Sequence, residues 1–187
     1  MSNYENKING ALEYLKKPSL LTPQGQKPIV FFVYDPKDAL VVRKTYQAYI
    51  RNKAEYVGFK PVFVSFGKML NDFISSNTEM IDIWRMLEAS DENKLFRSIR
   101  QYVETEKIFE KEFLRLQEEH LGEPNTLFVF TDLEMMHPFY LMGTFEASIY
   151  NEIKLPILVL YPGDNQGTAR SFLAVYNQDG NYRSVNY

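Results

Sequence analysis

The chain has 187 residues, a length at which one domain can bury about 70% of its unfolded surface in a single core. A hydrophobic content of 45% and an aromatic content of 15% are typical of a folded globular protein and exclude a disordered one. The net charge of -3 provides no general attraction to DNA or to an anionic membrane. The absence of cysteine excludes a disulfide framework, thiolate chemistry and cysteine-bound zinc.

The first segment of the chain is polar over residues 1–6 and lacks the apolar core of a signal peptide. No apolar run approaches the roughly 18 residues of a membrane span, so we expect a soluble, cytoplasmic protein. Residues 4–17 carry Ile8, Leu12 and Leu15 at helical spacing, which predicts an amphipathic helix at the periphery of the domain, within residues 1–17. This apolar stripe must be buried against another surface. The commoner case is that it packs on its own domain, and the alternative is that these three residues form an interface with a partner protein.

The next elements predict a parallel sheet. Ile29–Tyr34 is a continuous apolar run that predicts a first strand, and residues 37–57 predict a helix that ends at Gly58. A second strand is expected over residues 62–66. The order strand, helix, strand predicts a βαβ unit with a right-handed crossover.

A long helical stretch is expected over residues 75–122, after a short helix at 68–77. Its second part, from 93 to 121, predicts one long amphipathic helix or two that separate near Glu104 and Thr105. Since a crossover needs far fewer residues, we expect this insertion to project from the sheet as a helical subdomain.

The remaining elements complete the predicted fold. They are a third strand at 126–131, a helix at 138–153, a fourth strand at 156–161 and a terminal hairpin of residues 172–176 with 182–185. The expected class is α/β: a three-layer sandwich in one domain over residues 1–187. Its mostly parallel, doubly wound sheet would be P-loop-like or Rossmann-like, with a helical insertion and a C-terminal β-hairpin.

Acidic residues follow three of the predicted strands. Asp132 and Glu134 follow the third strand in the manner of a Walker B motif. The glycine-rich G-x-x-x-x-G-K-[ST] loop of such enzymes is absent, and Asp35 follows the first strand instead. An active P-loop ATPase is therefore not expected, although a degenerate nucleotide binder without hydrolysis stays open.

Two further interpretations concern the same strand ends. Asp35, Asp132, Glu134 and Asp164 would converge if their strands were adjacent, as a Mg²⁺-dependent phosphohydrolase or nuclease requires. The commoner explanation is that these acids form turns and helix caps, so no metal or cofactor is expected. His137 could share a proton with Asp132, but a structural turn histidine is the commoner case.

The loop at residues 163–168 is flanked by glycines and could direct backbone amides toward an anion. Arg170 would support that role and Asp164 would oppose it, while a tight connection between strands is the simpler explanation. The residues considered for binding are therefore at the predicted carboxyl edge of the sheet, none of them catalytic: Asp35, Asp132, Glu134, His137, Gly163, Asp164 and Arg170.

Three segments within residues 28–185 carry a family resemblance: the first strand with Tyr34-Asp35-Pro36, the run 127–132 with His137-Pro138-Phe139, and Leu160-Tyr161-Pro162-Gly163 with Gly167-Thr168, Phe172 and Asn181-Tyr182-Arg183. Together they resemble the BrxB family, which is encoded in bacterial BREX phage-defence loci and whose domain is of unknown function. Family members carry glycines and an arginine around the third strand end, where this chain has Asp132-Leu133-Glu134 and no arginine.

The resemblance implies a non-catalytic component of an anti-phage complex. It implies PglZ, an alkaline-phosphatase-like protein, as the neighbouring partner, alongside a DNA methyltransferase and a large ATPase. The N-terminal helix and the helical insertion are the surfaces assigned to that partner. No direct specific binding of nucleic acid and no membrane association are expected.

Overall fold

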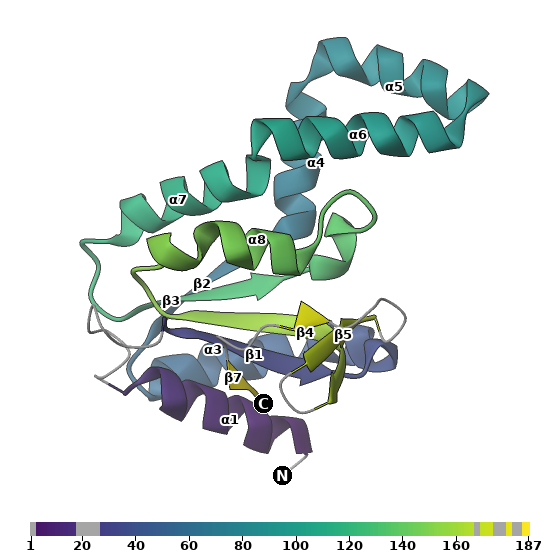
Figure 1. Cartoon of the computed structure of the whole chain (residues 1–187). Coiled ribbons are helices and arrows are strands. Elements are labelled where there is room, and N and C mark those ends of the chain that lie inside the picture. Colours follow the sequence, from purple (N-terminus) through teal and green to yellow (C-terminus); the bar gives the residue numbers. More distant parts are fainter. Residues whose placement is uncertain (1–2, 18–26, 167–168, 174–178, 181–184) are drawn as a thin grey trace.

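The computed structural model describes residues 3–17, 27–166, 169–173, 179–180 and 185–187 (Figure 1). The strands are β1 (Ile29–Tyr34), β2 (Lys60–Ser65), β3 (Thr126–Thr131), β4 (Ile157–Gln166), β5 (Ala169–Phe172), β6 (Asp179–Gly180) and β7 (Val185–Asn186). Within the described residues, no helix combines the length and the apolar character needed to cross a membrane.

The sheet is mostly parallel, as the sequence predicts. Its order is β2-β3-β4-β1-β7, and all four pairings along this path are parallel. Strands β1 and β3 have the predicted bounds, and both are buried over their whole length. Such strands are continuous apolar runs because helices cover both faces of a parallel sheet.

Helices lie on both faces of the sheet and make a three-layer α/β structure (Figure 1). One face packs under α1 (Asn3–Leu15) and α3 (Gln47–Tyr56). The other carries the larger core, beneath α4 (Phe66–Ser76), α7 (Ile108–His120) and α8 (Met142–Ile149). The predicted α/β class is confirmed.

Helix α1 packs on its own sheet, and the assignment of its apolar stripe to a partner is wrong. Ile8 and Leu12 are 0% exposed and Leu15 is 1% exposed. All three belong to the core formed with Val30 and Phe32 of β1. The apolar stripe of α1 covers its own sheet, because this face would otherwise be covered only by the helices of the first crossover.

The first crossover is one run of changing helical geometry rather than a regular helix. It comprises η2 (Pro36–Asp38), α2 (Ala39–Val41), the π-helical turn η3 (Val42–Tyr46) and α3. Strand β2 then ends at Ser65, one residue earlier than predicted. The Ser65 side chain accepts a hydrogen bond from the Lys68 backbone N–H, and this N-cap places Phe66 in α4.

The short helix predicted at 68–77 is α4, and the helical insertion predicted over residues 75–122 consists of α5 (Thr78–Ser90), α6 (Glu92–Glu106) and α7. Helices α5 and α6 form a hairpin that stands away from the sheet (Figure 1). The break between α6 and α7 is at Lys107, which has a left-handed backbone with φ 51°. The sequence predicted this break near Glu104 and Thr105, two to three residues before its observed position.

After β3 the chain forms the short helix η4 (Leu133–Met136), and α8 begins only at Met142. A helix from residue 138 was predicted. His137 has an extended backbone (ψ 140°), in keeping with the restriction that a following proline imposes. Helix α8 leads through η5 (Tyr150–Glu152) to β4.

A C-terminal hairpin is present as β5 with β6, which pair antiparallel, whereas most of the residues predicted to form it, 172–176 and 182–185, lie outside the described part of the chain. Strand β4 continues to Gln166 and pairs antiparallel with β5, whose register sets Gly163 opposite Phe172. Strand β6 pairs with β5, whereas β7 pairs in parallel with β1. Residues 18–26, 167–168, 174–178 and 181–184 are outside the described part, and with them the connector, part of the 163–168 loop, the turn and most of the last predicted strand.

Candidate binding site at the carboxyl edge of the sheet

The carboxyl ends of β1, β3 and β4 lie at one edge of the parallel sheet, where open α/β proteins bind their ligands. The structure brings Asp35, Gly163 and Asp164 together there, in a pocket of about 770 Å³. Its other walls are the start of α1, the end of β1 and Leu173. This pocket contains three of the residues predicted from the sequence.

Polar side chains of α1 and the first crossover shape the pocket. The Tyr4 hydroxyl donates to Asp38 Oδ2 (2.6 Å) and accepts from the Asp35 N–H (3.2 Å). Burial, aided by this bond to Asp38, raises the pKa of the Tyr4 hydroxyl. Asp35 Oδ1 accepts from the Lys37 N–H (2.9 Å) and so caps η2. The Asp35 carboxylate therefore serves the turn.

The charges around this pocket balance. Lys7 and Lys37 line it together with Asp35 and Asp164. Lys7 Nζ lies 3.5 Å from the Val33 carbonyl oxygen, at the end of β1. Two cations opposed by two carboxylates provide no concentrated positive potential, so the pocket lacks the electrostatics of a phosphate site.

Asp132 acts as a connector between β3 and α4. Its backbone is left-handed, with φ 58°. Its Oδ2 accepts from Ser65 Oγ (2.5 Å) and Thr131 Oγ1 (3.2 Å), and Ser65 Oγ itself accepts from the Lys68 N–H. The carboxylate thus joins the turn after β3 to the cap of α4, which is the structural role weighed above for strand-end acids.

Glu134 is the acid of this edge with the most perturbed environment. Burial, with a smaller contribution from the Asp132 charge, raises the pKa of its carboxyl against the opposing effects of its own N–H and Arg43. Burial and the charges of Glu134 and Asp132 also raise the pKa of the Tyr34 hydroxyl. Tyr34 lines the pocket, so this cluster of Tyr34, Asp132 and Glu134 adjoins it.

The magnesium hypothesis required the strand-end acids to converge on one point, and they do not. Among the residues that the structure describes, no three histidine, aspartate or glutamate side chains are placed to hold one ion. Asp35 turns to its own helix cap, Asp132 turns to Ser65, and Asp164 is exposed on β4. Parallel pairing places the carboxyl ends of the strands at one edge of the sheet, but local capping decides where each side chain points.

The side chains of His137 and Arg170 make contacts within the fold. The His137 ring stacks on Phe172 with centroids 4.9 Å apart. Arg170 is 2% exposed, and its Nη2 donates to Glu146 Oε2 at 2.9 Å. A role for Arg170 in binding an anion at the 163–168 loop is therefore wrong, because its guanidinium is already paired in the core.

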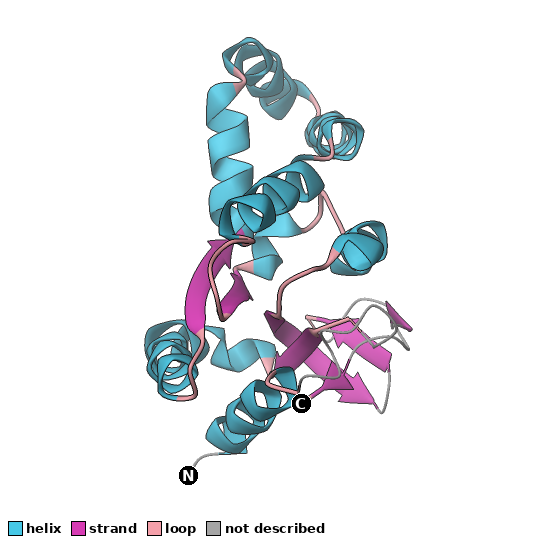
Figure 2. Cartoon of the chain, turned by 90° about the vertical axis from the view of Figure 1, so that its left-hand side faces the viewer, coloured by secondary structure: helices cyan, strands magenta, loops and turns pink. Residues whose placement is uncertain are grey.

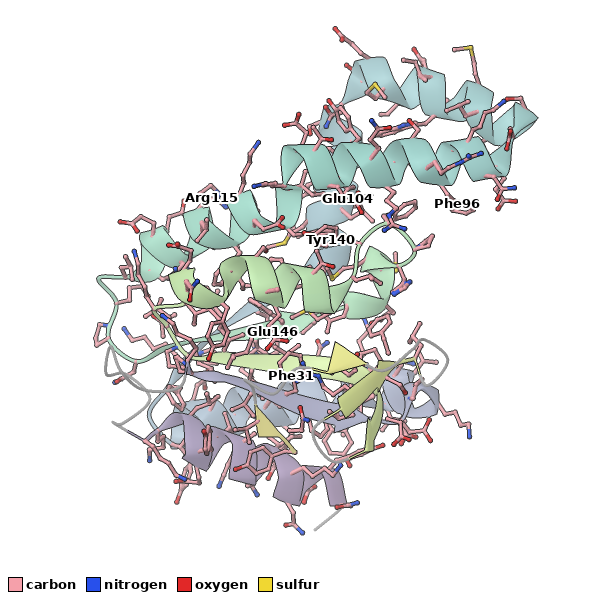
Figure 3. All side chains as sticks on the ribbon, in the orientation of Figure 1. Phe31, Phe96, Glu104, Arg115, Tyr140 and Glu146 are labelled. Atoms are coloured by element: carbon pink, nitrogen blue, oxygen red, sulfur yellow. The ribbon has the colours of Figure 1, made fainter. Side chains whose placement is uncertain are left out.

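Glu146 is the residue that sequence reasoning missed. It is 0% exposed and lies on α8, on the side facing the sheet, where Phe31 also lies (Figure 3). The Arg170 guanidinium carbon sits 3.4 Å from the Phe31 ring centroid, and Nη1 donates to Asn186 Oδ1 (2.9 Å). The available signal was its spacing, since it shares the buried face of α8 with apolar positions: Met142, Phe145 and Ile149.

Gly163 is required by the close approach of β5 rather than by a ligand. A Cβ atom at this position would lie 2.2 Å from the Ser171 carbonyl oxygen and 2.9 Å from Tyr161 Cε1. Gly163→Ala should lower the free energy of unfolding by about 1–3 kcal/mol, since the backbone must move. Urea denaturation measures this. Gly122→Ala is the matched control, because a Cβ there meets nothing within 4 Å; equal losses in both variants would contradict the assignment.

Comparison of the chain with protein-family models, with curated proteins and with solved structures gave no match.

Proposed function

We propose that the protein is a non-catalytic interaction component of a BREX-type anti-phage defence complex and that it binds a PglZ-like partner. The carboxyl edge supports the non-catalytic part of this proposal, since Asp35, Asp132 and Arg170 are engaged in capping and pairing. The resemblance to BrxB proteins supports the setting. The binding surface is the helical arm, defined here as α5 and α6, residues 78–106.

The observation that carries the proposal is the exposed apolar surface of this arm. Met86 is 64% exposed and Ile83 is 43% exposed, and their spacing of three residues sets them on one side of α5. Phe96 of α6 is 36% exposed and touches Phe139 of the loop before α8, with ring centroids 5.9 Å apart. Large apolar side chains that stay exposed on a projecting element are typical of a protein interface.

The arm has a small core of its own that holds these side chains in place. Trp84 is buried, contacts the Tyr102 ring (5.9 Å between centroids) and donates from Nε1 to Ser98 Oγ (3.1 Å). The Tyr102 hydroxyl donates to Asn77 Oδ1 (3.2 Å), and its ring packs on Phe73 of α4. A surface fixed in this way loses little conformational entropy when it binds.

Co-purification tests the proposal directly. The tagged protein should retain its PglZ-like neighbour, and Ile83→Glu with Met86→Glu should weaken that complex by about 30-fold or more, the effect of losing an interface hot spot. Tyr56→Glu is the control, since Tyr56 is 82% exposed on α3, outside the arm. Failure of the unmodified protein to retain the neighbour, or equal binding by both variants, would contradict the proposal.

A further inference from the structure

The two edges of the sheet differ. At one edge, the last residues of the chain cover β1: the Val33 N–H donates to the Tyr187 carbonyl (3.0 Å), and the Tyr187 N–H donates to the Phe31 carbonyl (2.9 Å). At the other edge, β2 pairs with β3 alone among the strands of the described residues. Figure 2 shows β2 at the outer side of the sheet, running into α4.

The register of β2 determines which backbone groups face outward. The Lys60 N–H donates to the Asn125 carbonyl (2.8 Å), so Lys60, Val62 and Val64 direct their backbone groups toward β3. The alternate residues, Pro61, Phe63 and Ser65, direct theirs away from the sheet. Pro61 has no N–H to leave unpaired, which suits an edge strand. The open edge therefore offers the N–H groups of Phe63 and Ser65 and the carbonyls of Pro61 and Phe63.

A pocket of about 760 Å³ adjoins this edge. Residues 63–65 of β2 form one wall, and α4 and α7 form the others. The apolar side chains that line it come from both helices: Met69, Phe73, Ile108 and Leu116. An edge strand beside an apolar pocket is the arrangement that binds an extended peptide, because the edge holds its backbone and the pocket takes alternate side chains.

The charges at the rim of this pocket are paired among themselves. Lys68 pairs with Asp72 on α4. Lys111 of α7 lies 3.3 Å from Glu106 at the end of α6, and Arg115 lies 2.7 Å from Glu112 within α7. Three cations and three carboxylates leave no net charge to attract a charged ligand. An occupant must therefore be held by backbone hydrogen bonds and by uncharged, apolar side chains.

We infer that an extended apolar segment of another polypeptide adds to β2 as a further strand and places alternate side chains between α4 and α7. Glu106 at the end of α6 is the one residue of the helical arm that lines this pocket, and the occupant need not be the partner proposed above. The strand would pair with the outward groups of Phe63 and Ser65. The paired rim would disfavour segments with charged residues at the pocket positions.

A random nonapeptide library displayed on phage tests this inference with the purified full chain. Panning should enrich peptides with alternating apolar residues. Met69→Glu, which places a charge among the apolar side chains of the pocket, should weaken the best peptide by about tenfold or more. Asn71→Glu adds the same charge to the exposed side of the same helix and should leave the affinity unchanged. No enrichment, or equal affinity for both variants, would overturn the inference.

Amide hydrogen exchange of the unmodified protein distinguishes strand addition from binding in the pocket alone, because only an added strand forms hydrogen bonds with the outward backbone amides of β2. With the peptide bound, the amides of Phe63 and Ser65 should gain protection of about tenfold or more, while those of Val62 and Val64, already bonded to β3, should stay unchanged. Equal changes at all four amides would contradict strand addition. Protection of Phe63 and Ser65 that rises with protein concentration without peptide would assign the edge to a second copy and overturn the inference.

Discussion

Replacing Arg170 by methionine should lower the free energy of unfolding by about 3–5 kcal/mol, the usual cost of removing one partner of a buried ion pair. Glu146 is 0% exposed, so its carboxylate would stay buried without the guanidinium that faces it at 2.9 Å. The same substitution removes the bond to Asn186 and therefore loosens the contact of β7 with the core. Urea denaturation followed by far-ultraviolet circular dichroism measures the change.

Two controls separate the ion pair from a general effect of losing arginine. Arg115→Met removes an arginine whose side chain is 52% exposed and should cost far less than Arg170→Met, although Arg115 has two carboxylate partners, because solvent screens exposed ion pairs. Adding Glu146→Gln to Arg170→Met should recover part of the loss, because no buried charge then remains. A loss in Arg170→Met no larger than that in Arg115→Met would show that the pair does not stabilise the fold.

Phe66→Ala should also destabilise the protein by about 3–5 kcal/mol, the range for a fully buried phenylalanine. Phe66 is 0% exposed and begins α4. Its ring centroid lies 5.3 Å from that of Phe109, 5.2 Å from Phe130 and 5.1 Å from Phe145. This one side chain therefore joins α4, α7 and α8 to the inner strand β3.

Thermal unfolding of Phe66→Ala should show a correspondingly lower midpoint temperature. Phe96→Ala is the matched control: the same change at a ring 36% exposed on the helical arm should have a clearly smaller effect. Similar midpoints for the two variants would mean that the helical insertion does not depend on Phe66 for its attachment to the sheet.

The proposals share one structural basis. The polar residues predicted to bind a ligand form contacts within the fold instead, whereas two surfaces outside the candidate site remain exposed. At the carboxyl edge, Asp132 caps through Ser65. In the core, Arg170 and Glu146 neutralise each other. The exposed Met86 on the arm and the open strand β2 have no such use within the described residues. They are accordingly the surfaces at which we expect other polypeptides to bind.

Several features could be predicted from sequence because they depend on local pattern. Strands β1 and β3 were predicted with their observed bounds, since a short apolar run rich in β-branched and aromatic residues between turn signals is typical of a buried strand. The helical character of residues 75–122 was also predicted, and most of that stretch is helical in the structure. The break at Lys107 was placed too early because a left-handed residue in a run of good helix formers leaves no compositional mark.

The candidate site was harder to predict because side-chain direction depends on contacts distant in sequence. Asp35 and Gly163 were expected near one edge and share a pocket there. Arg170 was expected at the same edge but is buried, because Glu146, 24 residues earlier, draws its guanidinium into the core. Nothing in the local sequence of either residue indicates the other.

By itself the amino-acid sequence determined that this chain forms a helix-covered, mainly parallel sheet, because apolar periodicity and turn residues act over short distances. The tertiary structure alone decided the strand order, the burial of α1, the pairing of Arg170 with Glu146, and which sheet edge remains open. These outcomes depend on which surfaces meet when the elements pack, and that is a property of the whole folded chain.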